Sequence, residues 1–172
     1  MLIHQDCEQI AFLRNHTNPY FSALETRELQ AAADVLGLRL LVFNASNREE
    51  IEAAFANVVA QRAGAFLLGT DPFFISERDK LVSLANHHAL PAVFPFREDT
   101  LAGGLASYGA SNREAFHLLG GYAGRILSGE KPAELPVQQV TRLEMAINLK
   151  TAKALGLTVP PTLLARTDEV IE

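Results

Sequence analysis

A short apolar run in the middle of the chain, bounded on both sides by turn residues, constrains the fold more than any other stretch. Residues 63–74 read AGAFLLGTDPFF, in which residues 65–68 are an apolar segment of strand length between Gly64 and Gly69. A strand without polar alternation is normally buried on both faces, as in a parallel sheet covered by helices. We therefore expect this strand at the centre of an open α/β sheet.

Two polar residues follow this run directly. Thr70 and Asp71 come just after the expected strand, at the end where open α/β sheets bind their ligands. Asp71 also stands immediately before Pro72, and Asp in that position is a common turn former. The sequence therefore leaves two interpretations of Asp71 open, as a turn former and as a ligand contact.

Apolar runs and helical periodicities elsewhere in the chain complete an alternating pattern. Further strands are expected at residues 10–13, 39–43, 91–94 and 104–108. Helices are expected from about Ser22 to Gly37, from a capping box of Ser46 and Glu49, from about Ser76 to residue 88, and over residues 112–128. This order predicts an α/β fold with a doubly wound, mostly parallel five-stranded sheet of order 2-1-3-4-5, flanked by helices.

The C-terminal part reads as a return segment added to this sheet. Residues 142–148 alternate between apolar and polar side chains, which predicts a half-exposed strand at an edge. A short helix is expected over residues 149–155, with Gly156 at its end. The tail around Pro160 and Pro161 is expected to be irregular.

Composition excludes several classes of function. The net charge of −5 gives no electrostatic argument for binding nucleic acid or an anionic membrane. Cys7 is the only cysteine, so an internal disulfide and a cysteine zinc site are excluded. His87 and His88 end a helix without a further ligand at metal-binding spacing, so we expect no metal. The N-terminus lacks a signal pattern, so the chain is expected in the cytoplasm if it is expressed as given.

No known catalytic pattern is present, but a set of polar and aromatic residues follows the strands. The sequence has no phosphate-binding glycine loop and no nucleophile elbow. A phospho-receiver domain is excluded because the loop RNHTNP after the first strand has no acidic residue for a divalent cation. The remaining set describes a small-molecule cleft better than a reaction centre: Asn15, Thr17, Asn18, Tyr20, Thr70, Asp71, Phe73, Phe96, Arg97, Tyr108 and Gly109.

Four stretches of the chain resemble a known family. They are residues 10–19 (IAFLRNHTNP), 25–37 (ETRELQAAADVLG), 124–136 (GRILSGEKPAELP) and 143–156 (LEMAINLKTAKALG). They are similar to ABC transporter substrate-binding proteins of the type I periplasmic-binding-protein fold, and most similar to the subgroup with tryptophan and tyrosine transport components. The motifs GRILSGEKPAELPVQQ and INLKTAKALG are specific as a pair in that order.

The resemblance implies a division of the chain. Family members have two α/β lobes that close on a ligand, and this sequence resembles the second lobe together with its return segments, without the first. It implies an N-terminal extension (residues 1–9), a solute-binding lobe (10–110), a helix belonging to the first lobe (111–139) and a return segment (140–172). Hinge crossings are expected near residues 110–111 and 137–140.

The family's second-lobe ligand loops match residues 15–22, 70–73, 96–97 and 108–110 of this chain. The first of these loops adds Ser22 to the candidate ligand contacts. Tyr20 and Phe21 stand in that loop where small or polar residues are usual in the family.

The resemblance therefore implies a non-catalytic, cofactor-free component of an ABC importer. Its ligand would be a small organic solute, an amino acid or an aromatic acid, its partner a permease, and its compartment the periplasm. An orphan oligomeric lobe that acts as an interaction module is the alternative; an enzyme on a flavodoxin-like sheet lacks a visible nucleophile–base pair. One apolar face of helix 112–128 predicts a homodimer through that helix; it consists of Phe116, Leu119, Ala123, Ile126 and Leu127.

Overall fold

A mixed sheet of seven strands, in the order β2-β1-β3-β4-β5-β6-β7, organises the chain in a computed structural model that describes residues 7–172. Most of the expected N-terminal extension, residues 1–6, lies outside the described residues. The strands are β1 (Gln9–Arg14), β2 (Arg39–Asn44), β3 (Ala65–Leu68), β4 (Ala92–Phe94), β5 (Ala106–Ala110), β6 (Leu143–Asn148) and β7 (Glu169–Ile171).

The predicted order 2-1-3-4-5 is confirmed, but the sheet continues beyond it. Strands β1 to β5 are all parallel, β6 runs antiparallel to β5, and β7 runs parallel to β6. The prediction of an edge strand at residues 142–148 is wrong, because β7 pairs with the outer side of β6 and is itself the edge strand. The prediction of an irregular tail is wrong for the same reason: three residues pair there, as in Ala146 with Glu169, and so short a strand shows no periodicity.

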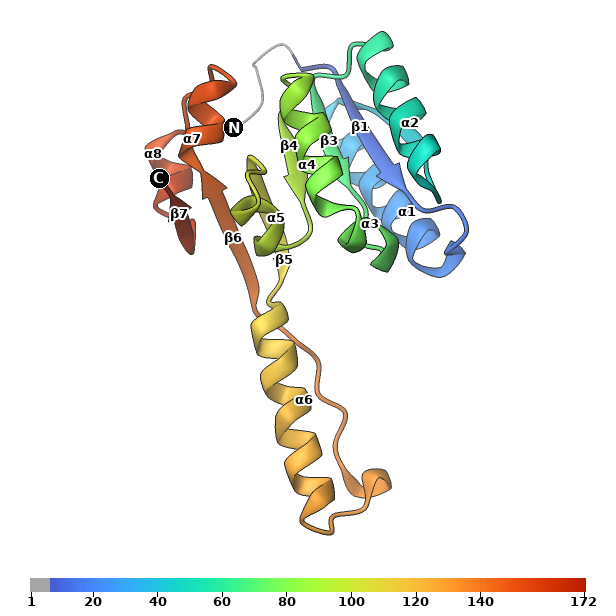
Figure 1. Ribbon diagram of the computed structural model, residues 1–172, viewed down its shortest axis with the longest axis vertical. Coiled ribbons are helices and arrows are strands. Elements are labelled where there is room, and N and C mark those ends of the chain that lie inside the picture. Colours follow the sequence, from blue (N-terminus) through green and yellow to red (C-terminus); the bar gives the residue numbers. More distant parts are fainter. Residues whose placement is uncertain (1–6) are drawn as a thin grey trace.

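Helices lie on both faces of the sheet (Figure 1). They are α1 (Pro19–Leu36), α2 (Arg48–Ala60), α3 (Pro72–Ser76), α4 (Arg78–His87), α5 (Arg97–Leu101), α6 (Asn112–Leu127), α7 (Leu149–Ala154) and α8 (Pro161–Leu164), with a short 3-10 turn η1 (Pro132–Glu134). Helix α1 lies behind the sheet in Figure 1, and α2 and α4 lie in front of it.

The main core fills the space between the sheet and the helices α2 and α4. Phe66 and Leu68 of β3 point into it together with Leu13 of β1, and they pack against Phe55 of α2 and Leu81 of α4. Because side chains alternate along a strand, Leu67 lies on the opposite face. The expected burial of the central strand is confirmed for Ala65, Phe66 and Leu68, whereas Leu67 on the α1 face is only partly buried.

A second, smaller core supports the C-terminal part of the sheet. Leu105, Ala106 and Ile147 pack there with Ala152 of α7 and with Val159. This cluster fixes β6 and β7 beside β5. It therefore positions the residues at the start of β6 and β7, which lie near the carboxyl end of β5.

Several helices begin elsewhere than the sequence predicts. Helix α1 begins at Pro19 rather than near Ser22, because proline is well suited to the first helical position: the N–H that it lacks would have no helical partner there, and its fixed φ already suits the helix. The capping box is shifted by one residue: Asn47 caps α2 by accepting from the Glu50 amide at 2.9 Å, and Ser46 donates to the Glu50 carboxylate instead of Glu49.

The segment after β3 also differs from the prediction of one helix starting at Ser76. Asp71 caps the short helix α3, and α4 follows from Arg78 after a break at Glu77. The predicted loop after the fourth strand contains the one-turn helix α5, which is too short to show an apolar stripe.

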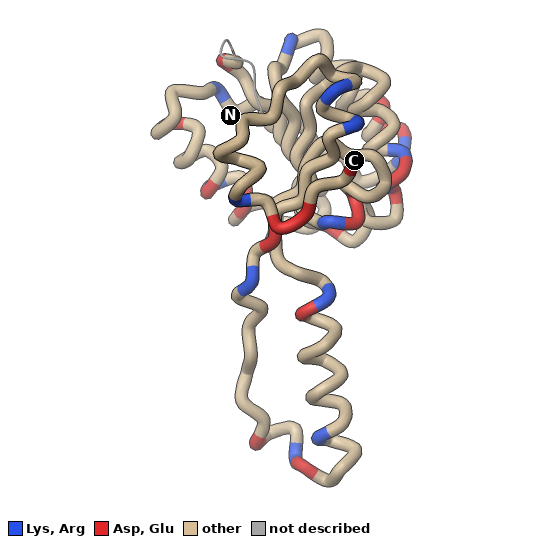
Figure 2. The backbone as a smooth tube through the Cα atoms, turned by 90° about the vertical axis from the view of Figure 1, so that its left-hand side faces the viewer, with Lys and Arg blue, Asp and Glu red and all other residues tan. Residues whose placement is uncertain are grey.

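Helix α6 leaves the sheet and forms the outgoing half of an arm, defined here as residues 111–142 (Figure 1). The helix predicted at residues 112–128 is confirmed, but none of its residues is buried. Phe116 is 71% exposed and Leu127 is 88% exposed. Figure 2 shows that the charged residues of the arm gather at its base and its tip, so that its middle carries none.

Candidate functional site

The carboxyl ends of the parallel strands β1, β3, β4 and β5 meet at one edge of the sheet, which is the edge from which the arm leaves (Figure 1). Ligands of open α/β sheets bind at this edge. Each residue of the candidate set lies in a loop, a strand end or a first helical turn at this edge. The candidates differ in whether their polar groups are already bonded within the protein.

Asp71 is the centre of a hydrogen-bond network, called here the Asp71 network, that joins the loop after β1 to the loop after β3. Asp71 Oδ1 accepts from Asn15 Nδ2 at 3.0 Å and from the Phe73 amide at 2.9 Å, and Oδ2 accepts from Asn18 Nδ2 at 2.9 Å. Thr17 donates to Asn15 Oδ1 through its amide at 3.0 Å and its hydroxyl at 2.7 Å. Asp71 therefore caps α3 and fixes the loop after β1.

The protonation of Asp71 follows from these contacts. Asp71 is only 6% exposed, and burial alone would raise the pKa of its carboxyl group. Hydrogen bonds from Asn15, Asn18 and the Phe73 amide act in the opposite direction and hold the pKa of Asp71 below its ordinary value. The network is therefore built around a carboxylate.

The loop after β3 is fixed from a second side by α1. The Thr70 amide donates to Glu25 Oε1 at 3.0 Å. Ser22, which is buried, donates through its amide to the Asn18 carbonyl at 3.2 Å and accepts from Thr26 Oγ1. Glu25 was not among the predicted residues, since its partner is 45 positions away and no local pattern connects the two.

Several aromatic side chains at this edge are exposed or only half-buried. Tyr20 is 75% exposed and packs edge-on against Phe21, with ring centroids 5.3 Å apart. Phe73 is half-buried against Phe74. Tyr108 is half-exposed on the face of the sheet that carries α1.

Tyr108 and Thr70 line a groove of about 490 Å³, called here the Tyr108 groove. Phe12, Leu67 and Val93 turn their apolar side chains to this face of the sheet, and α1 forms one wall with Leu24 and Leu29. Strand residues Leu68 and Phe94, whose side chains point into the main core, also border the groove, together with Pro95 at the end of β4. The groove offers an apolar surface beside the bonded loops.

Gly109 is required by the backbone beside it. A Cβ atom built on Gly109 would lie 2.2 Å from the carbonyl oxygen of Pro95, which no side chain can accommodate. The end of β5 thus passes directly against the loop after β4. Close approach of two backbones explains glycine at this position without any ligand.

The loop after β4 holds Phe96 and Arg97 in bonded arrangements. The Phe96 amide donates to Asp99 Oδ2 at 3.1 Å, and Asp99 Oδ1 accepts from Arg78 Nε at 2.7 Å. Burial raises the pKa of Asp99, although Arg78 opposes this effect. Arg97 forms a two-point ion pair with Glu169 of β7, and this hydrogen bonding raises the pKa of Arg97. The guanidinium of Arg97 therefore lies apart from the Tyr108 groove.

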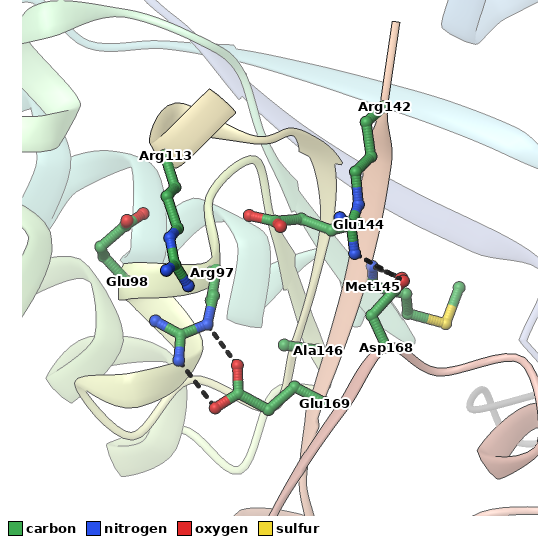
Figure 3. A pocket seen from close by; sticks show the side chains of 9 residues that line it. All are labelled: Arg97, Glu98, Arg113, Arg142, Glu144, Met145, Ala146, Asp168 and Glu169. Carbon is green, nitrogen blue, oxygen red and sulfur yellow. Dashed lines mark hydrogen bonds and ion pairs between the residues drawn. The ribbon is translucent and has the colours of Figure 1, made fainter. Parts of the chain in front are cut away.

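Arg97 opens instead onto a charged pocket of about 320 Å³, called here the Arg113 pocket (Figure 3). Three arginines and four carboxylates line it, contributed by α5, the first turn of α6, and the starts of β6 and β7. They are Arg97, Glu98, Arg113, Arg142, Glu144, Asp168 and Glu169, with Met145 and Ala146. Sequence reasoning found only Arg97, since the others come from segments distant along the chain.

Two further features are absent from the described residues. Residues 7–172 contain no group of three or more His, Cys, Asp or Glu side chains arranged to hold a metal ion. In the same part of the chain, no helix combines the length and apolarity needed to cross a membrane.

Comparison with known proteins gives one family. The family model described as ABC transporter substrate binding protein matches residues 6–171. Among curated proteins, none matches the chain significantly. The matched region includes every residue of the Asp71 network, the Tyr108 groove and the Arg113 pocket.

Solved structures with the same fold cover nearly all of this chain. An ABC domain from Streptococcus pneumonia in complex with L-Trp superposes with a TM-score of 0.85 at 25% identity, over 99% of this chain and 57% of that one. A conserved domain protein from Vibrio cholerae gives 0.83 at 22% identity, over 98% and 56%. A ligand-free, open substrate-binding protein with adhesive properties from Clostridium difficile gives 0.68 at 20% identity, over 96% and 55%. The chain thus spans little more than half the length of these structures.

Proposed function

We propose that this chain, which belongs to the ABC transporter substrate-binding protein family, binds a small organic solute at the carboxyl edge of its sheet for uptake by an ABC importer. The observation that carries the proposal is the match of the family model to residues 6–171. Proteins of this family bind their substrate and do not convert it, so the chain is not an enzyme.

The solute we propose is an amino acid or an aromatic acid. Tyr20, Phe21 and Tyr108 expose aromatic rings at the binding edge. Packing of one aromatic ring against another contributes about 0.5–1.5 kcal/mol beyond the burial of area. The Streptococcus pneumonia structure, which has the same fold, holds L-Trp. Both observations support a ligand with an aromatic group.

The candidate residues divide into two roles under this proposal. Contact with the solute would come from groups that are exposed or not fully bonded, and these are Thr17, Asn18, Tyr20, Thr70, Phe73, Tyr108 and Gly109. The remaining candidates would position the loops, since three of them are buried and the other two are held by Asp99 and Glu169. These are Asn15, Ser22, Asp71, Phe96 and Arg97.

The proposed organisation assigns a separate role to the arm. Residues 10–110 would form the solute-binding lobe, residues 111–139 would pack on a further α/β lobe, and residues 140–172 would return to the first sheet. The exposed apolar residues of α6 support this division, because each large apolar side chain left in water forgoes about 1.5–3 kcal/mol. The partner of the loaded protein would be a permease and its compartment the periplasm.

The same exposed face favours a second candidate function. A chain whose arm packs on the arm of another copy would be a homodimeric interaction module, with or without a solute. Phe116, Leu119 and Ile126 are 71%, 59% and 42% exposed and would be covered in such a dimer. Closed two-fold symmetry is the commonest way in which proteins bury a shared face.

A thermal-shift screen with amino acids and aromatic acids separates the two candidates. Solute binding predicts that L-tryptophan or a related compound raises the melting temperature in proportion to the logarithm of its concentration. Tyr20→Ala is expected to reduce this shift in melting temperature. Val35→Ala is the matched control, since it removes an exposed side chain at the far end of the same helix. No shift with any compound, together with a dimer by light scattering, would favour the interaction module.

A further inference from the structure

Strand β2 forms one lateral edge of the sheet, and its outer side carries backbone groups without a partner among the described residues. In the sheet order, β2 pairs with β1 on its inner side. The amide of Arg39 donates to the carbonyl of Glu8 at 2.8 Å, and the amide of Ala45 donates to that of Arg14 at 3.0 Å. The odd-numbered residues of this strand therefore direct their N–H and C=O groups toward β1.

The even-numbered residues direct theirs outward, because the backbone groups of successive residues in a strand point to opposite sides. These residues are Leu40, Val42 and Asn44. We call their outward N–H and C=O groups the β2 edge. Within residues 7–172, none of these groups takes part in a turn or loop hydrogen bond.

Strand β2 also lacks the features that usually protect an edge strand. Natural sheets shorten their edge strands or place Lys, Pro or a bulge in them. The opposite lateral edge follows this rule, since β7 has only three residues. In contrast, β2 has six residues, RLLVFN, in unbroken register with β1, and its Val42 is 36% exposed. Such an edge is suited to pairing with a further strand.

We propose that two copies of the chain pair through β2 in antiparallel orientation, so that their sheets join across a two-fold axis at Val42. Outward groups pair only with outward groups, so Leu40 of one copy lies opposite Asn44 of the other, and Val42 lies opposite Val42. Each of these pairs exchanges two hydrogen bonds, so the three pairs give about six. This register uses every backbone group of the β2 edge.

Charge supports a second copy as the occupant of this edge. The register places Arg39 of one copy opposite Ala45 of the other, so no like charges are directly opposed. Ala45 leads into Ser46, whose amide and hydroxyl donate to Glu50 Oε2 at 2.7 and 3.0 Å. These bonds lower the pKa of Glu50 and keep it a carboxylate. The exposed Arg39 of each copy therefore comes near the Glu50 carboxylate of the other.

The surface beside β2 leaves room for the second copy. A hollow of about 280 Å³ lies between β2 and α2, and the small side chains of Ala53 and Ala54 border it together with Phe43. On the opposite face of the sheet, the two Val42 side chains would meet at the axis. Branched side chains of this kind pack well across paired strands. Both faces of the joined strands thus gain apolar contacts.

The inference does not rest on solute binding, and it leaves the arm free. The solute-binding candidates follow the carboxyl ends of β1, β3, β4 and β5, whereas the proposed axis lies on the outer side of β2. The apolar residues of α6, such as Leu119, take no part in the proposed contact. Dimers through the β2 edge and through the arm are therefore distinguishable by substitution.

Light scattering and amide hydrogen exchange on the whole chain test the pairing together. The chain is expected to be a dimer at micromolar concentration. The amides of Leu40, Val42 and Asn44 are expected to exchange slowly in the dimer and quickly once dilution has produced monomers. A chain that remains monomeric would overturn the inference, and so would a dimer in which these three amides exchange quickly.

Val42→Pro is the decisive variant, because proline removes an outward N–H and leaves the bonds to β1 in place. Two hydrogen bonds are lost at the axis, so the dissociation constant of the dimer is expected to rise about tenfold or more. Val42→Lys is a second variant that keeps the N–H and sets two like charges opposite each other. Leu119→Asp is the control and should remain a dimer. A dimer that withstands both Val42 variants would overturn the inference.

Arg39→Glu tests the charge contact and hence the register. It is expected to weaken the dimer severalfold at low salt and less at high salt, because salt screens the repulsion from Glu50. Arg166→Glu is the matched control: it makes the same change of charge at an exposed residue between α8 and β7, near the opposite lateral edge. Equal effects of the two substitutions on the dissociation constant would contradict the register with its axis at Val42.

Discussion

The Nδ2 atom of Asn15 lies 3.0 Å from Oδ1 of Asp71, and this hydrogen bond joins the ends of β1 and β3 across 56 positions of sequence. The bond is buried, and Asp71 uses its remaining acceptor capacity on Asn18 and on the amide of Phe73. The turn-forming interpretation of Asp71 is thereby confirmed. A loop that would meet the solute is held in place by a carboxylate that is itself occupied.

Asp71→Ala is expected to lower the free energy of unfolding by about 2–4 kcal/mol, because it removes a helix cap and leaves two amide donors without an acceptor. Urea denaturation measures the loss. Asp79→Ala, an exposed acidic residue in the first turn of α4, is the control and should change stability by less than about 1 kcal/mol. A cost at Asp71 no greater than at Asp79 would contradict the network.

The Asp71 network also predicts a dependence of stability on pH. The pKa of Asp71 is lower in the folded chain than in the unfolded chain, so its contribution is present above the unfolded pKa of about 4 and is lost as the pH falls through the folded value. Burial of Asp99 raises the pKa of that group and acts in the opposite direction. The difference between the unchanged chain and Asp71→Asn isolates Asp71, and it should shrink on acidification below about pH 4.

Gly109→Ala is expected to cost about 1–3 kcal/mol or more, because the new Cβ atom would meet the Pro95 carbonyl at 2.2 Å and the backbone must move. Gly120→Ala is the matched control: it lies in α6 with nothing within 4 Å of a built Cβ, so it should stabilise the helix by about 0.5–1 kcal/mol. Thermal unfolding should show a lower melting temperature for Gly109→Ala and a higher one for Gly120→Ala. Equal effects would show that β5 and the loop after β4 are not in contact.

The arm leads to a prediction about assembly. If α6 joins two copies, the chain will be a dimer by light scattering at micromolar concentration, and Leu119→Asp will produce monomers or precipitate. Glu130→Gln at the tip is a control that leaves the apolar face intact and should not change the mass. A monodisperse monomer from the unchanged chain would exclude the homodimer.

Much of the fold follows from local patterns. The apolar run of β3 and the alternation of strands with helices predict the parallel order β2-β1-β3-β4-β5, since both are properties of contiguous sequence. The short segments β7 and α5 were missed, because three to five residues without a continuous apolar run establish no period. Val59 continues the apolar stripe of α2 and yet is 45% exposed, since a stripe does not state how far the sheet extends beneath it.

The site was predictable only in its location. Residues that follow parallel strands meet at one edge, and this rule brought Asn15, Thr70 and Tyr108 to the same region. Partners from distant segments were not predictable: Glu25 reaches Thr70 from within a helix, and Arg113 meets Glu98 and Glu144 only after the chain has left the sheet and returned. No local spacing encodes such a meeting.

A crystal structure of this chain grown with L-tryptophan tests the central claim most directly. Solute binding at the carboxyl edge predicts electron density for the ligand between the loops after β1, β3, β4 and β5 and the base of the arm, with the indole ring beside exposed aromatic side chains such as Tyr20 or Tyr108. The contrary result is a crystal grown in saturating L-tryptophan in which this edge holds no ligand or the ligand lies elsewhere on the chain.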